Sequence, residues 1–359
     1  MCLRKLCVRS DMTLFKSSVD KAIDRLLKLQ SDIRRRYAKL SGPINAITLA
    51  TKLTSSQLEA VKSLKQFNFY PRLGHVESTF FDVSQSTSYR FQRAAQLGVI
   101  NHSKRLPPRV VSVKGNSVRF AKLVGLPTPE CEYPLKLEEI AVERPCVIKP
   151  VHSEGGRCIY ALTPGAGGVI HDLFSGGCYS DEESLRSSIR SDTKKAGIQK
   201  DAWLREEMIV GSSGSPLDTF DVKVYTFYGE VGLVLQVDRW HGRRYRFFDP
   251  SGRMVNTGKY PSEPDIPPVF DARLIEIARE VSGKIPWAHV RIDFLVSDSD
   301  WRFGEFTLRP GGAANFNEEW DRRLGDLFVR AQARLHEDLL LGKEFSEYQS
   351  LLSDTGKKA

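Results

Sequence analysis

The chain has 359 residues, of which 41% are hydrophobic, 27% charged and 10% aromatic. This composition is typical of a soluble globular protein and excludes collagen, extensive disorder and small disulfide-rich scaffolds. No stretch has the roughly 20 consecutive apolar residues that cross a bilayer. The basic start at residues 1–5 has no apolar segment after it, so we predict no signal peptide and a cytoplasmic protein. The six cysteines include no CxxC pair, which favours reduced thiols over a zinc site.

A net charge of +9 raises the question of nucleic-acid binding, but most of this charge lies at the N-terminus. Residues 1–40 contain eleven Lys and Arg against four Asp, a net of +7, and the remainder is close to neutral. We therefore expect no nucleic-acid partner. Apolar residues at three- and four-residue steps predict a basic helix over 13–39. Its charged face is either a contact with a membrane surface or a biosynthetic complex, or simply a solvated face.

Beyond this segment the apolar pattern predicts a succession of helices and short strands. Residues 55–67 repeat the helical pattern weakly, and 79–93 show no clear periodicity. Strands are predicted at 110–113, 146–148, 158–162, 203–210, 221–228, 231–238, 290–296 and 301–308. Helices are predicted at 117–124, 182–196, 267–282 and 321–341. Gly229 and Glu230 mark the turn of a hairpin.

The first candidate for chemistry is Lys149, which follows an apolar strand and precedes a glycine-containing loop at 151–157. A lysine charge beside backbone N–H groups suits phosphate binding. The sequence is neither a Walker A motif nor a GxGxxG motif. An edge-strand lysine followed by an ordinary turn explains the same residues, and both readings stay open.

The second candidate is Asp221 with Lys223, at the start of the hairpin. Alternation places both side chains on one face of the strand. They form either part of a site or an ordinary ion pair on the polar face of a half-buried strand.

The strongest candidate is a pair of neighbouring strands that carry Arg291, Asp293, Glu305 and Thr307. Pairing of the two strands would bring Asp293 and Glu305 together beside Arg291 and Thr307. Two carboxylates with a basic group suit magnesium, which takes one or two carboxylates plus substrate phosphates. A purely structural charge cluster is the alternative.

Two histidines, His152 and His289, are further candidates for polar site residues. A lone histidine is more often structural, and we find no Ser-His-Asp or Cys-His arrangement that indicates a covalent nucleophile.

Taken in order, these features resemble the ATP-grasp superfamily, and in particular its teichuronopeptide-biosynthesis (TupA-like) family. The matching segments are Val-Ile-Lys-Pro at 147–150 with the loop 152–156, Arg-Glu-Glu-Met-Ile at 205–209, 221–229, Arg-Ile-Asp at 291–293 and 304–312. The resemblance covers about residues 108–330, and residues 1–105 show no such likeness.

The resemblance implies an α+β ATP-grasp fold in which two α+β lobes clasp ATP. The expected organisation is a helical, basic region at 1–105 on the substrate side, a first lobe at 106–202, a second lobe with the metal site at 203–345, and a tail at 346–359.

The resemblance also implies a role for each matching residue. The residues expected to bind ATP are Lys114, Lys149, His152, Ser153, Glu154, Gly155, Gly156, Glu206, Glu207, Met208 and Ile209. Asp293, Glu305 and Thr307 would hold Mg²⁺. Arg291 and Lys223 would act on the transferring phosphoryl group, and Arg309, Gly311 and Gly312 would border the acceptor substrate.

Two positions depart from the pattern that the family implies. Thr307 stands where many ATP-grasp enzymes place an asparagine, and a hydroxyl is a weaker metal ligand. The earlier lysine that contacts ATP, expected near residue 115, is matched only approximately by Lys114.

The family implies an ATP- and magnesium-dependent ligase that joins a small-molecule carboxylate to an amine through an acylphosphate. The TupA-like branch implies attachment of an amino acid in cell-surface polymer or peptide-like biosynthesis, at the cytoplasmic or inner membrane face. The alternatives are an ATP-grasp kinase acting on a small hydroxyl substrate, and a scaffold that binds ATP without turnover.

Overall fold

The computed structural model describes residues 87–103, 107–151, 157–261 and 267–355. All of them belong to one compact unit, Asp82–Ala359. The helix predicted over 13–39 and the weaker pattern at 55–67 lie outside the described residues. Among the helices described, none has both the length and the apolar character that a membrane crossing requires.

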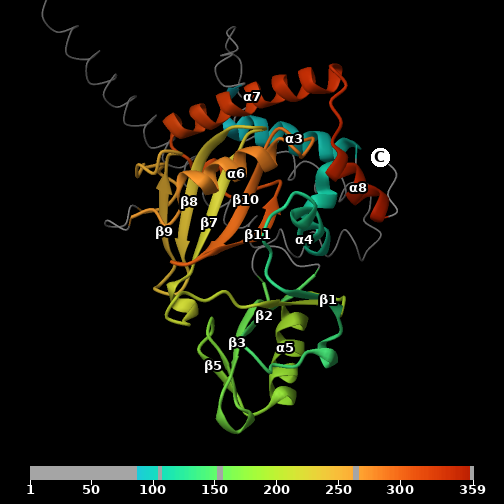
Figure 1. The fold of residues 1–359 in the computed structure, drawn as a ribbon, viewed down its shortest axis with the longest axis vertical. Helices are drawn as coiled ribbons and strands as arrows, with labels where there is room; N and C mark the ends of the chain where they lie inside the picture. Colours follow the sequence, from blue (N-terminus) through green and yellow to red (C-terminus); the bar gives the residue numbers. More distant parts are fainter. Residues whose placement is uncertain (1–86, 104–106, 152–156, 262–266, 356–359) are drawn as a thin grey trace, which may run out of the picture. The chain divides into compact units, whose positions relative to one another are not determined.

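The first sheet has six strands, and every neighbouring pair is antiparallel (Figure 1). In spatial order they are β1 (Cys131–Leu135), β6 (Trp203–Glu207), β2 (Cys146–Pro150), β3 (Tyr160–Pro164), β4 (Ile170–Asp172) and β5 (Gly177–Tyr179). Helix α5 (Glu182–Lys195) is capped by Asp181, whose carboxylate accepts from the backbone of Ser184. Its buried Leu185 and Ile189 join the apolar core of this sheet.

The second sheet has five antiparallel strands. In spatial order they are β11 (Trp301–Thr307), β10 (Val290–Val296), β7 (Phe220–Thr226), β8 (Val231–Asp238) and β9 (Arg244–Phe248). Alternate residues such as Val222 and Ile292 are fully buried, in one core with Leu274 and Ala278 of α6 (Ala272–Ser282). Burying these residues leaves the alternate positions of the same strands for polar side chains.

Helices cover one face of the second sheet. Figure 1 shows α6, α3 (Tyr89–Ser103) and α7 (Glu318–Leu340) above the strands. Phe328 of α7 and Tyr89 of α3 share the core of that sheet. The remaining helical segments are η3 (Pro107–Ser112), α4 (Lys114–Leu123), η4 (Leu137–Glu139), η5 (Ala166–Gly168), η6 (Pro216–Asp218), η7 (Ala313–Asn315) and α8 (Ser346–Asp354).

Helix α4 lies against β11. The Ser117 hydroxyl accepts a hydrogen bond from the backbone N–H of Phe306 at 3.2 Å, and the ring of Phe120 packs edge-on against that of Phe306 with centroids 5.5 Å apart. These contacts fix the start of α4, and with it Lys114, relative to the strand that carries Glu305.

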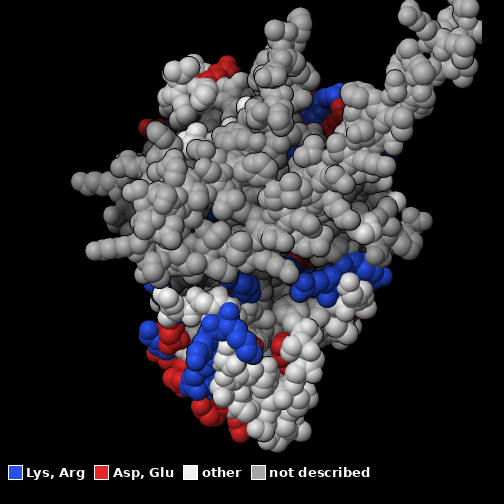
Figure 2. Space-filling view, turned by 180° about the vertical axis from the view of Figure 1, so that it is seen from behind, with Lys and Arg blue, Asp and Glu red and all other residues white. Residues whose placement is uncertain are grey.

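Several predicted elements are confirmed. The hairpin appears as β7 and β8, the two acidic strands appear as β10 and β11, and the predicted helix at 182–196 is α5. Figure 2 shows Lys and Arg side chains gathered in groups on the described surface of that face, with Asp and Glu side chains beside some of them, while other described parts carry neither.

Three local predictions are wrong. The strand predicted at 110–113 is the 3₁₀ helix η3, because so short an apolar run does not distinguish the two structures. Helix α6 begins at Ala272 rather than at 267, where two prolines precede it and Asp271 caps it by accepting from Leu274 N at 2.9 Å. Residues 79–93 gave no helical signal, yet α3 begins at Tyr89.

The expected boundary between the lobes at 202 and 203 also needs correction. Strand β6, which we placed at the start of the second lobe, lies inside the first sheet, because it pairs with both β1 and β2. The first sheet therefore extends to Glu207.

Candidate active site

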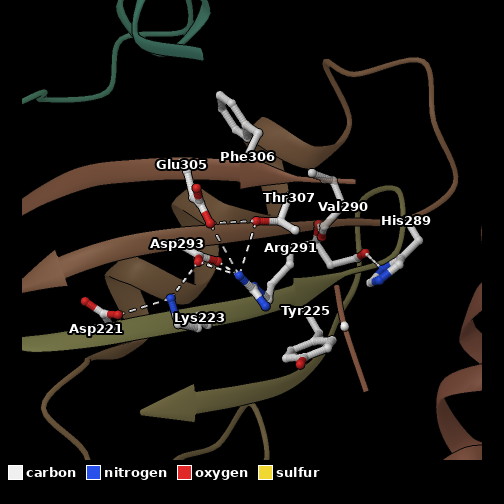
Figure 3. Close-up of polar contacts among 12 residues, drawn as sticks. Asp221, Lys223, Tyr225, His289, Val290, Arg291, Asp293, Glu305, Phe306 and Thr307 are labelled. Carbon is white, nitrogen blue, oxygen red and sulfur yellow. Dashed lines mark hydrogen bonds and ion pairs between the residues drawn. The ribbon is translucent and has the colours of Figure 1, made fainter. Parts of the chain in front are cut away.

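The candidate site lies on one face of the second sheet, where β7, β10 and β11 run side by side (Figure 3). In the antiparallel register Lys223 is opposite Asp293, and Asp293 is opposite Glu305. Arg291 is opposite Thr307 in the same register. Paired residues of neighbouring strands share a face, so these five side chains form one polar cluster.

Asp293 is the buried centre of this cluster, with 5% of its side chain exposed. Arg291 donates from Nε to Oδ1 at 2.6 Å and from Nη2 to Oδ2 at 2.7 Å, and Lys223 Nζ lies 2.7 Å from Oδ2. Burial alone would raise the pKa of Asp293, but the charges of Arg291 and Lys223 outweigh burial and lower it. The carboxylate is therefore ionised at neutral pH and fixes both cations.

Asp221 extends the cluster along β7. Its carboxylate lies 3.2 Å from Lys223 Nζ and forms an ion pair with Arg239. Burial opposes ionisation, yet Lys223 and Arg239 together lower the pKa of Asp221 to about 2. Lys223 thus bridges two buried carboxylates, which orients its ammonium group.

Glu305 is the accessible carboxylate of the cluster, with 50% of its side chain exposed. Its Oε1 accepts from the Thr307 hydroxyl at 3.0 Å and lies 3.6 Å from Arg291 Nη2. The neighbouring Gly304 matters for this position, because an added Cβ there would lie 3.1 Å from the Asp293 carbonyl oxygen. Glycine at 304 lets the two acidic strands approach closely.

The oxygen atoms on this face could supply some, but not all, of the ligands of a magnesium ion. Asp293 and Glu305 supply two carboxylates and Thr307 a hydroxyl, which leaves the other positions for phosphate oxygens and water. Within the described part of the chain, no group of three or more His, Cys, Asp or Glu gathers as a cation site. A cation between Asp293 and Glu305 would share the Asp293 carboxylate with Arg291 and Lys223.

On the first sheet, Lys149 is held by Glu206 of the neighbouring strand. The ammonium lies 2.7 Å from the carboxylate, and both side chains are largely buried. Burial would lower the pKa of Lys149, but Glu206 outweighs it and Glu305 adds to the increase. Lys114 of α4 donates to the backbone carbonyl of Pro150, so it is held at the end of the strand that carries Lys149.

The other residues expected to bind ATP are only partly placed. The Glu207 carboxylate accepts from Glu130 N at 3.2 Å, and Met208 is buried where the chain leaves β6. Ile209 follows in non-regular backbone. The expected loop of His152, Ser153, Glu154, Gly155 and Gly156 lies outside the described residues.

The segment expected to border the acceptor adjoins a lysine that the sequence did not single out. Lys259 Nζ donates to the Gly311 carbonyl at 2.8 Å and to the Tyr225 hydroxyl at 3.3 Å. Burial, with a contribution from the charge of Arg291, lowers the pKa of Lys259 to about 8. Gly312 adopts a left-handed conformation with φ of 67°, and Arg309 is exposed. Nothing in the polar turn around Lys259 signals its burial.

His289 is structural. Its ring is fully buried, with Nε2 at 2.9 Å from the Tyr89 hydroxyl and Nδ1 at 2.8 Å from the Thr226 carbonyl. Burial lowers its pKa to about 3, so the ring is neutral, donating from Nδ1 and accepting at Nε2. Both ring nitrogens are therefore engaged in hydrogen bonds inside the core.

No curated protein matches the chain. Three solved structures to which this chain is similar are the following. The ATP-grasp ligase PsnB complexed with minimal precursor is 12% identical and has a TM-score of 0.38, with 67% of this chain and 70% of that chain covered. The D-alanine–D-alanine ligase of Bacillus anthracis complexed with ATP is 13% identical and has a TM-score of 0.38. The match covers 64% of this chain and 66% of that chain. A RimK domain ATP-grasp protein of Sphaerobacter thermophilus is 11% identical and has a TM-score of 0.37. The match covers 62% of this chain and 68% of that chain.

The model of the TupA-like ATP-grasp family matches residues 130–329, more than half of the chain. This match includes both sheets and the polar cluster on β7, β10 and β11. It confirms the resemblance that the ordered motifs indicate, together with the α+β fold. The chain belongs to the TupA-like ATP-grasp family.

Proposed function

We propose that the protein is an ATP- and magnesium-dependent ligase that joins a carboxylate to an amine. The observation that carries the proposal is the row Lys223, Asp293 and Glu305, held in register across three strands with Arg291 beside it. Two carboxylates next to two fixed cations suit phosphoryl transfer, which needs both a bound metal and stabilisation of charge on the transferring oxygens.

ATP would bind through residues of both sheets. Lys149 of β2 and Lys114, which is held at the end of the same strand, would contact the phosphates together with the loop 152–156. Residues 206–209 would lie along the adenine. The Glu206 side chain is already paired with Lys149 at 2.7 Å, so we assign adenine contacts to the backbone of this segment and a positioning role to the carboxylate.

The metal would be held by Asp293 and Glu305, with Thr307 as a weaker ligand. When bound, Mg²⁺ would neutralise phosphate charge and align the γ-phosphoryl group. The accessible Glu305 would turn toward the metal, while Asp293 stays fixed by its two ion pairs.

The reaction would proceed through an acylphosphate. A substrate carboxylate oxygen attacks the γ-phosphorus and ADP leaves. The amine then attacks the acyl carbon, phosphate leaves with the former carboxylate oxygen, and the nitrogen loses a proton to give the amide. Arg291 and Lys223 would stabilise charge on the transferring group. Arg309, Gly311 and Gly312 would border the acceptor, and the buried ammonium of Lys259 on the Gly311 carbonyl would fix that border.

For the cellular role, we propose that the enzyme attaches an amino acid during synthesis of a cell-surface polymer or a peptide-like product. The basic segment 1–40, with its net charge of +7, would contact the inner face of the membrane or a biosynthetic complex. We propose residues 106–207 as the first lobe, 208–345 as the second and 1–105 as the substrate side.

Phosphorus NMR of the full chain with magnesium, ATP and pooled amino acids and amino sugars tests the proposal. ADP and free phosphate that form only when both a carboxylate and an amine are present would support the ligase. A new phosphoester signal would instead identify a kinase, and ATP that binds without turnover under every combination would identify a scaffold.

A further inference from the structure

Helix α3 carries two arginines one turn apart whose charges are compensated differently. Arg90 Nε lies 3.0 Å from the buried carboxylate of Asp321. Arg93 instead donates from Nη1 to two neutral acceptors, Gln96 Oε1 at 2.6 Å and the Leu308 carbonyl at 3.1 Å. Its Nε is buried without a hydrogen-bond partner among the described residues. A half-buried guanidinium group that has no carboxylate partner in the described part of the chain is unfavourable, and an anion bound beside it would relieve that cost.

A second arginine adjoins Arg93. The contact with the Leu308 carbonyl places Arg93 beside Arg309, the next residue in that segment. Arg309 is exposed, and no ion pair joins it to any described residue. Burial lowers the pKa of Arg93, and the positive charge of Arg309 contributes in the same direction. The backbone of Arg309 is therefore held next to Arg93, and among the described residues no carboxylate forms an ion pair with either guanidinium group.

The same segment is held at its other end by Lys259, whose ammonium contacts the Gly311 carbonyl at 2.8 Å. Segment 308–311 is thus fixed by a cation at each end. Arg93 lies outside the matched family region, 130–329, so α3 adds a charge from a part of the chain that the family model does not include.

We propose that Arg93 and Arg309 together bind a carboxylate of the substrate that lies along segment 308–312. The proposal rests on the proposed ligase function and adds the class of substrate, a dicarboxylic acid. The carboxyl that becomes an acylphosphate changes its charge during the reaction. A guanidinium pair that holds the substrate throughout therefore needs a second, permanently ionised carboxylate, and guanidinium groups match carboxylates in geometry as well as charge.

Isothermal titration calorimetry of the full chain tests this with two probes of nearly equal shape, glutarate and its monoamide glutaramate. Wild type should bind glutarate about tenfold to a hundredfold more tightly, as expected for charge-assisted hydrogen bonds. Arg93→Gln should remove the preference, and Arg93→Lys should restore part of it. Arg330→Gln is the matched control, because Arg330 lies on α7 with 63% of its side chain exposed.

Two results would overturn the inference: a wild type with no preference for glutarate, or a preference that survives in Arg93→Gln. Far-UV circular dichroism and thermal melting of Arg93→Lys and Arg93→Gln establish that both variants fold. Binding of Mg²⁺–ATP is titrated separately on wild type. Its absence would defeat the proposed function, whereas intact nucleotide binding without a preference for glutarate would defeat only the carboxylate subsite.

Discussion

Asp293 and Glu305 are paired across β10 and β11, yet 5% of the Asp293 side chain is exposed against 50% for Glu305. Arg291 and Lys223 fix the first carboxylate through three contacts of 2.6–2.7 Å. The second carboxylate is held mainly by the Thr307 hydroxyl. We infer a division of roles in which Asp293 is a fixed anchor and Glu305 adjusts when a cation binds.

Glu305→Gln should lower ADP formation about a hundredfold or more, because the amide is a poor ligand for a hard cation. The fold should survive, since the side chain is half exposed. A coupled assay of ADP release against magnesium concentration measures the loss. Glu318→Gln, at a side chain 86% exposed on α7, is the control and should retain full activity. Undiminished turnover in Glu305→Gln would refute the metal assignment.

Lys149→Met should weaken binding of Mg²⁺–ATP about tenfold or more and also destabilise the fold. It leaves the Glu206 carboxylate buried without its partner, at a cost on the order of 3 kcal/mol. The double variant Lys149→Met/Glu206→Gln should recover stability but not nucleotide affinity. Urea unfolding and calorimetry separate the two effects. If the double variant binds nucleotide as wild type does, Lys149 has only a structural role.

Lys259 should make the protein more stable as the pH rises above 8. Its pKa is lowered from 10.5 to about 8 by burial, so between these values the unfolded chain binds a proton that the folded chain has released. The unfolding free energy should gain about 3 kcal/mol across this interval. Lys259→Met should lack this contribution. Urea unfolding of both proteins between pH 7 and 10.5 measures this difference. If the unfolding free energies of wild type and variant change with pH in the same way, the pKa of Lys259 is not lowered in the folded protein.

Tyr89→Phe should cost about 1 kcal/mol of stability without changing ADP formation per folded molecule. The substitution removes the hydroxyl that lies 2.9 Å from His289 Nε2 and leaves that buried acceptor unsatisfied. Thermal melting and a turnover assay on the same preparation measure both quantities. A specific loss of turnover with unchanged melting would place His289 in the chemistry instead of the core.

The site could be predicted from sequence only where local pattern determines the structure. The alternation of residues along 290–296 and 301–308 predicts that Asp293 and Glu305 face each other on paired strands, and the register confirms this prediction. Lys259 and Arg93 could not be found in this way, because their surroundings are set by residues far along the chain, at Gly311 and Leu308. The position of β6 between β1 and β2 could not be predicted either, because the sequence of a strand does not specify which distant strands pair with it.

Transfer of oxygen from a carboxylate to phosphate tests the ligase chemistry most directly. The full chain would be incubated with magnesium, ATP, a pool of ¹⁸O-labelled carboxylic acids and hydroxylamine as a general nucleophile, with Glu305→Gln in parallel. Phosphorus NMR should reveal released phosphate that carries one ¹⁸O in wild type and none in the variant. Phosphate without ¹⁸O, or a stable phosphoester, would contradict an acylphosphate and with it the assignment as a carboxylate–amine ligase.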